Sequence, residues 1–247
     1  FHAYPGIRAQ PRSRGLGDVY KRQASTIAAA VVEPIASYSL GAESTFMLYH
    51  KESGDVLSLS GQGTASGKAT PEYFISRGYE SIPTGPGKSA PHSFTVPGVV
   101  ASCLSLLDRY GTMSVEEVFS PAIEYAESGI VNYEYMIGRL GAGDSIKQFE
   151  LFPPGGLEVF FDSGEIPEAG TILVQKSLGT VLGNIVNSAN AAGGSRSDGI
   201  KAARDCFYSG EIAEKISECS IKVGGILEKN DLETYVEQYD VPLSVSY

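Results

Sequence analysis

A change of apolar periodicity near Pro97 limits the folds open to this chain. After Pro97, apolar residues recur every three or four positions, as they do on one face of an α-helix. The first such face comprises Val99, Cys103, Leu106, Leu107 and Tyr110. Before Pro97, residues 45–49 and 56–59 form two short runs rich in β-forming side chains, and Gly54 supplies a turn between them. We expect a hairpin followed by helices, which favours one α+β domain in which helices dominate.

Capping signals predict where several helices begin. Thr70 followed by Pro71 is a typical start, because threonine caps a free N–H group and proline is tolerated in the first turn. Ser114, with Glu117 three residues later, forms the pattern of a capping box. Because a proline inside a helix costs about 3 kcal/mol, we expect this helix to restart at Pro121. A later apolar stripe, which we expect to be buried, comprises Ile212, Ile216, Cys219 and Val223.

Residues 1–23 differ in composition from everything that follows. Their basic residues are Arg8, Arg12, Arg14, Lys21 and Arg22, beside the single acid Asp18. The segment has no apolar core of the kind found in secretory signals, and its prolines interrupt any amphipathic helix. Residues 18–23 also resemble a translated sequencing adapter. We therefore interpret 1–23 as a non-native leader and 24–247 as the domain, incomplete at both ends, and we assign no cellular compartment.

Composition excludes several classes of function. The chain has 247 residues, with 19 Lys plus Arg against 29 Asp plus Glu and a net charge of −10. Sequence-independent binding to nucleic acid or to anionic lipid requires clustered cations, which so acidic a chain does not predict. No run of about eighteen apolar residues occurs, so no membrane span is expected.

The three cysteines are too few and too scattered for a disulfide scaffold, and no CxxC pair occurs. Cys103 and Cys219 fall on apolar helical stripes, which favours core packing over nucleophilic chemistry. The sequence leaves the role of Cys206 open.

Other residues that could carry chemistry form no complete site. Residues Gly85–Ser89 look like a phosphate-binding loop, but the first glycine of that pattern is replaced by Ile82, so we expect a turn. His2, His50 and His92 lack a second His or Cys at ligand spacing, so we expect surface or hydrogen-bonded histidines. No GxSxG, HExxH or paired-carboxylate pattern occurs. We therefore assign no catalytic residue and no metal site, and no metal or organic cofactor is implied.

An ordered series of short motifs, running from about Ala24 to Tyr247, resembles the large subunit of the γ-glutamyltranspeptidases, which are N-terminal-nucleophile hydrolases. Each motif alone is weak, but their order makes coincidence improbable. The motifs are Val31–Pro34 with Phe46–Tyr49, Gly61–Ser66 with Ala69–Phe74, Val96–Ala101 with Arg109–Thr112, Ser120–Gly129, Gly170–Gln175, Phe207–Ala213, and Gly224–Leu227 with Asp231, Leu232 and Tyr235.

The resemblance implies a helix-rich large-subunit portion of the four-layer αββα fold. Members of this family cleave their own chain to expose a threonine, whose hydroxyl attacks the amide of a γ-glutamyl compound such as glutathione, with its own α-amine as base. The acyl group then passes to water or to an amino-acid acceptor. Because the threonine begins the small subunit and no segment here matches it, we expect a fragment that is inactive alone and partners with its own small subunit.

Gln62 is the candidate substrate-binding residue, and it departs from the family pattern. It aligns with the loop arginine that grips the substrate α-carboxylate, and Gly63 aligns with a neighbouring glutamate. Glutamine keeps hydrogen-bond donors but loses the charge, so affinity for a free carboxylate should fall. Two interpretations of Gln62 stay open: an amidohydrolase of the same fold for another small amide, and a loop shifted by one residue with another cation in its place. A non-catalytic scaffold or binding protein that kept the fold after losing the nucleophile is a further alternative for the whole chain. Residues 39–44 also hold one glycine, Gly41, where relatives carry several.

Overall fold

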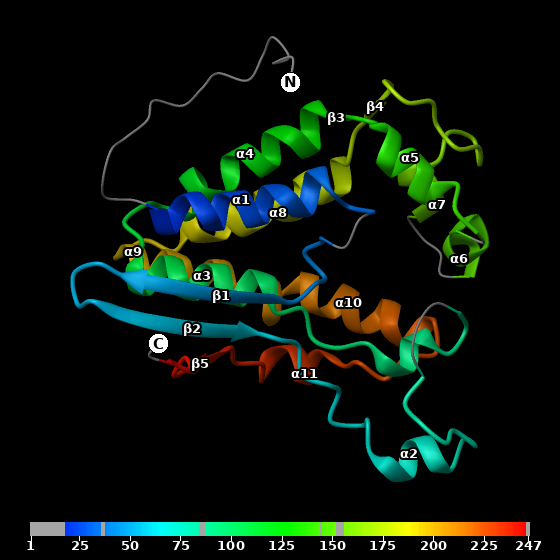
Figure 1. Ribbon diagram of the computed structural model, residues 1–247, viewed down its shortest axis with the longest axis horizontal. Coiled ribbons are helices and arrows are strands. Elements are labelled where there is room, and N and C mark those ends of the chain that lie inside the picture. Colours follow the sequence, from blue (N-terminus) through cyan, green and yellow to red (C-terminus); the bar gives the residue numbers. More distant parts are fainter. Residues whose placement is uncertain (1–17, 36–37, 84–86, 144, 152–155, 246–247) are drawn as a thin grey trace.

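The computed structural model describes residues 18–35, 38–83, 87–143, 145–151 and 156–245. Most of the core lies among five helices, namely α1 (Asp18–Val32), α3 (Val99–Tyr110), α4 (Val115–Ser128), α8 (Lys176–Ala191) and α9 (Arg196–Tyr208). Helix α1 packs on α3 and α4, while α8 packs on α4 and α9. In Figure 1, α1 and α8 overlap in one row between α4 and α3. The architecture is helix-rich α+β, as the sequence predicts.

The predicted hairpin is confirmed. Strands β1 (Ser44–His50) and β2 (Asp55–Gly61) pair antiparallel, and β5 (Gln238–Asp240) pairs antiparallel with the other edge of β2. Gly54 adopts a φ of 77° in the turn, a conformation that favours glycine. One face of this sheet packs on α3 through the cluster Leu48, Leu59 and Leu106. The end of β2 therefore places the residues after Gly61 beside the beginning of α3.

The other elements are short and lie around this core. They are α2 (Pro71–Ile75), a 3-10 turn (Ala90–Ser93), β3 (Ile130–Val131), α5 (Glu134–Leu140), α6 (Ser145–Leu151), α7 (Gly156–Phe160), β4 (Ile172–Leu173), α10 (Glu211–Lys222) and α11 (Lys229–Glu233). Strands β3 and β4 form a separate antiparallel pair. In the part of the chain that the structure describes, no helix combines the length and apolar character needed to cross a membrane.

The predicted helix starts are confirmed at both capped positions. The Thr70 hydroxyl accepts a hydrogen bond from the Tyr73 N–H at 3.2 Å, and Ser114 and Glu117 form the reciprocal bonds of a capping box. The predicted restart at Pro121 is wrong, because α4 runs through it without a break. Phe119 and Ala122, on either side of the proline, are fully buried, so packing against the core holds the helix together despite the lost hydrogen bond.

The buried face of α10 also differs from the prediction. Ile212 and Ile216 are half-buried and Cys219 is exposed, so the expectation that Cys219 packs in the core is wrong. The residues that α10 buries are small: Ala213, Ser217 and Ser220. Small side chains let this face approach its neighbours closely, and the Ser220 hydroxyl accepts a hydrogen bond from the Leu227 N–H at 3.1 Å. The larger side chains of Ile212 and Ile216 pack against the edge of the core and stay partly exposed.

Helix α1 begins inside the segment interpreted as a leader. It starts at Asp18 rather than Ala24, and the side chain of Gln23 is fully buried, with Nε2 donating to the Cys103 carbonyl at 3.2 Å. Gln23 Oε1 is buried without a hydrogen-bond partner among the described residues. The last residues of the leader thus join the fold, while the non-native origin of 1–23 stays a prediction.

Candidate functional site

The loop that follows β2 runs directly against the beginning of α3. Ala65 and Thr95 form a β-bridge, and the Val96 N–H donates to the Thr64 carbonyl at 2.9 Å. Gly63 is required here, because a Cβ atom on it would lie 2.2 Å from the Val96 carbonyl oxygen. A Cβ atom on Gly98 would likewise lie 2.0 Å from the Gly61 carbonyl oxygen, so the loop and the start of α3 approach too closely for a side chain at either glycine.

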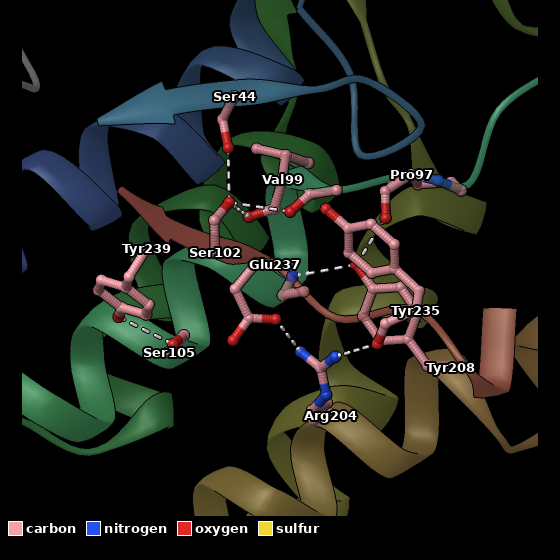
Figure 2. Close-up of polar contacts among 12 residues, drawn as sticks. Ser44, Pro97, Val99, Ser102, Ser105, Arg204, Tyr208, Tyr235, Glu237 and Tyr239 are labelled. Carbon is pink, nitrogen blue, oxygen red and sulfur yellow. Dashed lines mark hydrogen bonds and ion pairs between the residues drawn. The ribbon is translucent and has the colours of Figure 1, made fainter. Parts of the chain in front are cut away.

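Two stacked tyrosines, Tyr235 and Tyr208, contact both the loop after β2 and the start of α3. The Tyr235 hydroxyl donates to the Gln62 carbonyl at 3.0 Å, and its ring stacks on that of Tyr208 at 5.8 Å between centroids. Tyr208, from the end of α9, donates to the Pro97 carbonyl at 2.6 Å and accepts from the Ala101 N–H at 3.0 Å (Figure 2). Burial raises the pKa of Tyr208 well above its usual range, so it stays a neutral donor.

Arg204 completes the support beneath the tyrosines. Its Nη1 pairs with the Glu237 carboxylate at 2.9 Å, and its Nη2 donates to the Tyr235 carbonyl at 2.7 Å (Figure 2). Both charged side chains are largely buried, and the guanidinium also lies 5.0 Å from the Tyr208 ring. Burial and the nearby Glu237 raise the pKa of Tyr235. The charge of Arg204 is therefore paired with Glu237 beneath the site. Removing one partner of such a largely buried ion pair lowers the stability of the fold.

The far end of the loop is tied to the segment around α11. The buried Ser66 hydroxyl donates to the Ile226 carbonyl at 2.7 Å, and the Gly67 N–H donates to Asp231 Oδ1 at 2.9 Å. Lys68 forms an ion pair with Glu228. Residues 61–68 are thus anchored at both ends by elements near the end of the chain.

Gln62, the candidate substrate-binding residue, lies in this anchored loop, and its side chain is exposed. Its backbone carbonyl is held by Tyr235, which leaves the amide side chain as the part that can meet a ligand. The Gln62 side chain is therefore accessible to a ligand, as the role implied by the resemblance requires.

Glu43 is the site residue that sequence reasoning missed. Its Oε1 accepts a hydrogen bond from the Gly63 N–H at 3.0 Å and another from the Thr95 hydroxyl at 3.2 Å. It precedes β1, twenty residues before Gly63, and sits in the stretch where relatives were expected to carry glycines. An acidic side chain in a stretch where the resemblance implies several glycines is the signal that the sequence offers for this residue.

The other predicted residues lie away from this loop or outside the described residues. His50 Nδ1 is 2.9 Å from the Ser53 hydroxyl and His92 Nδ1 is 2.7 Å from the Tyr73 hydroxyl, as expected, while His2 is not among the described residues. Gly85 and Pro86 of the predicted turn are also outside them. Among the described residues, no group of three His, Cys, Asp or Glu side chains could hold a metal ion.

The three cysteines have different environments. Cys103 is buried in the core, where desolvation raises the pKa of its thiol to about 12, and the prediction of a packing role is confirmed. Cys206 is half-buried and Cys219 exposed, and both line an open groove of about 1260 Å³ between α8, α9 and α10. Ile212 and Ile216 face the same groove, which explains why the predicted stripe on α10 is not buried.

Comparison with known proteins places these features in a family. A family model described as gamma-glutamyltranspeptidase matches residues 23–247. A glutathione hydrolase proenzyme of Bacillus subtilis is 28% identical over 97% of this chain and 39% of its own length, and an acylase ACY 1 proenzyme of a Pseudomonas species is 27% identical over 91% and 38%.

A solved structure gives the same result for the fold. The crystal structure of the Helicobacter pylori gamma-glutamyltranspeptidase superposes with a TM-score of 0.78 at 26% identity, covering 93% of this chain and 60% of that one. The chain spans about two fifths of the length of the curated relatives named above. Since the family model covers nearly all of its residues, the chain belongs to the γ-glutamyltranspeptidase family of N-terminal-nucleophile hydrolases.

Proposed function

We propose that this chain is the large-subunit portion of a γ-glutamyl amidase, acting as a hydrolase or transferase on compounds such as glutathione. The observation that carries the proposal is the Gly61–Ser66 loop, which is anchored at both ends and presents an exposed Gln62 at the position of the family's substrate-binding arginine. The relative from Bacillus subtilis is named a glutathione hydrolase proenzyme, which supports both the activity and a chain that is cut.

The reaction requires a nucleophile that we place outside this chain. A threonine exposed by self-cleavage would attack the amide carbonyl with its hydroxyl oxygen, while its own α-amine takes the hydroxyl proton. The C–N bond of the amide then breaks, the amine leaves with a proton, and water or an amino acid removes the acyl group. The residues of this chain contribute the wall that binds the acyl end, and the partner is the small subunit formed by the cleavage.

The sharpest test is an assay of the full-length gene product on γ-glutamyl-p-nitroanilide, with the chain composition checked by mass spectrometry. We expect two chains, turnover, and loss of turnover when the threonine that begins the second chain is replaced by alanine. The 247-residue chain alone should be inactive. Turnover by that chain alone would contradict the proposal.

A second candidate function is an amidohydrolase for a different small amide, and Gln62 is the observation that favours it. A Pseudomonas relative named as an acylase proenzyme supports this range of substrates within the family. Under this alternative, Gln62→Arg in the full-length protein should improve turnover of γ-glutamyl compounds, because a guanidinium binds a carboxylate more strongly than an amide does. Good wild-type activity on glutathione with no gain in the variant would rule the alternative out.

A further inference from the structure

We propose that Glu43 sets the charge preference of the acyl site, so that it favours an acyl group ending in an ammonium and disfavours one ending in a carboxylate. This inference rests on the proposed function, because it assumes that the Gln62 loop binds the acyl end of an amide. It goes further by naming the residue that decides which acyl groups are accepted.

The resemblance implies an acid at position 63, where this chain has a glycine. Gly63 cannot carry a side chain in this backbone, since a Cβ atom would lie 2.2 Å from the Val96 carbonyl oxygen and 2.8 Å from the Thr95 hydroxyl. A carboxylate nevertheless reaches this point, because Glu43 Oε1 accepts from the Gly63 N–H and from the Thr95 hydroxyl. Glu43 thus brings a negative charge to the loop from a different part of the chain.

The charges of the residues at positions 62 and 63 and of Glu43 differ from those that the resemblance implies. The resemblance implies an arginine and a glutamate in this loop, which together are neutral. Here the arginine is replaced by the uncharged Gln62, while an acid is present as Glu43, so the charge that Glu43 brings to Gly63 has no arginine at position 62 to balance it. Glu43 is close enough to Tyr235, whose hydroxyl holds the Gln62 carbonyl, to raise the pKa of that tyrosine together with burial and Glu237.

Two cations near the loop, Arg204 and Lys68, are engaged by other acids. Arg204 pairs with Glu237, and Lys68 pairs with Glu228, so each of these two cations already has its own acid. The Glu43 side chain is exposed, and both of its bonds to the loop end on the same oxygen. A ligand can therefore approach the carboxylate, and a like charge placed there is disfavoured while an opposite charge is attracted.

The test uses four p-nitroanilides that carry different end groups on the same atom, the fourth carbon counted from the amide carbonyl. The 4-aminobutyryl compound carries only an ammonium, the glutaryl compound only a carboxylate, the γ-glutamyl compound both, and the butyryl compound neither. For the full-length protein we expect the 4-aminobutyryl substrate to have the highest kcat/KM and the glutaryl substrate the lowest. Glu43→Gln should reduce the ratio between these two by about tenfold or more.

Glu43→Gln keeps an oxygen that can accept from Gly63 and Thr95, so the loop should keep its shape. The matched control is Glu52→Gln, which removes the same charge from the hairpin turn, where the side chain is 80% exposed and lies 3.9 Å from His50. This control should leave the ratio unchanged. A wild-type preference for the glutaryl compound, or a ratio that Glu43→Gln does not change, would overturn the inference.

A binding measurement separates this inference from the proposed function. Absence of turnover with all four compounds would refute the amidase, and the inference would then be decided by the thermal stability of the full-length protein in 4-aminobutyrate and in glutarate. Stabilisation by 4-aminobutyrate alone, lost in Glu43→Gln, would support Glu43 as the charge-selecting residue. Equal stabilisation by both compounds, or by neither, would refute it.

Discussion

The core helices and α10 are both amphipathic, but they bury different kinds of side chain. Helix α3 buries large residues such as Leu104 and Leu107 between α1, α9 and the hairpin. Helix α10 buries alanine and serine, and Ile212 and Ile216 line an open groove. An apolar stripe therefore identifies a surface that can be covered, whereas the side-chain size on each face and the position of neighbouring helices decide which face is covered.

The reactivity of the cysteines should show the largest difference between the two regions. In the folded 247-residue chain, a maleimide at pH 8 should label the exposed Cys219 at least about a thousandfold faster than the buried Cys103, whose labelling requires unfolding. The pKa of the Cys103 thiol, raised to about 12 by burial, adds to its protection. Peptide mapping after timed quenching would measure both rates, and similar rates would mean that α3 and α10 are equally exposed.

Two isoleucine truncations test the same contrast energetically. Ile185→Ala in α8 removes a fully buried side chain and should lower the free energy of unfolding by about 2–5 kcal/mol. Ile216→Ala in α10 removes a half-buried side chain that faces the groove and should cost about 1 kcal/mol. Urea denaturation of both variants measures the difference. Equal losses would show that the groove side of α10 is packed as tightly as the core.

Tyr208→Phe tests how far the end of α9 secures the candidate site. The variant leaves the Pro97 carbonyl and the Ala101 N–H without their buried partner, so we expect a loss of about 1–3 kcal/mol in the free energy of unfolding. Tyr49→Phe, which changes a tyrosine that is 62% exposed on β1, is the control and should be nearly neutral. Similar effects of the two changes would contradict the supporting role of Tyr208.

The smallest expected difference between a core helix and α10 is in how the stability of the fold depends on pH in the acid range. Hydrogen bonds from the backbone and hydroxyl of Ser114 lower the pKa of Glu117 on α4, and Lys215 lowers the pKa of Glu211 on α10. Each acid therefore stabilises the fold at neutral pH, and that contribution is lost as the pH falls below about 4.5, the ordinary glutamate value, through the lowered pKa.

Glu117→Gln and Glu211→Gln should each flatten the acid side of a plot of Tm against pH between about 6 and 3. High salt should abolish the effect at Glu211, an exposed ion pair, and leave most of that at Glu117, which rests on local hydrogen bonds. Glu124→Gln, at an exposed position on α4, serves as the control. Equal salt sensitivity at Glu117 and Glu211 would contradict this assignment.

The parts of the fold that depend on neighbours in sequence could be predicted. The hairpin turn at Gly54 and the capping box of Ser114 are both decided by a few adjacent residues. The continuity of α4 through Pro121 and the orientation of α10 could not be predicted, because both follow from packing against helices distant in the chain.

The candidate site divides in the same way. Gln62 could be found because it lies within a motif of the resemblance. Glu43 could not be placed beside Gly63 from the sequence, since twenty residues and a β-hairpin separate them, and the support by Arg204 and Tyr208 spans even longer distances. A loop residue can be identified by its motif, but the charges that surround it come from the folded chain.

The most direct test of this account is to trap the acyl intermediate in the full-length protein. The purified gene product would be quenched during turnover of its best p-nitroanilide substrate and analysed by mass spectrometry of the intact chains and their peptides. We predict two chains, with the acyl group attached to the N-terminal threonine of the second. An uncleaved protein, or an acyl group attached to a residue of the 247-residue chain, would contradict the claim that this chain forms the binding wall for a nucleophile located elsewhere.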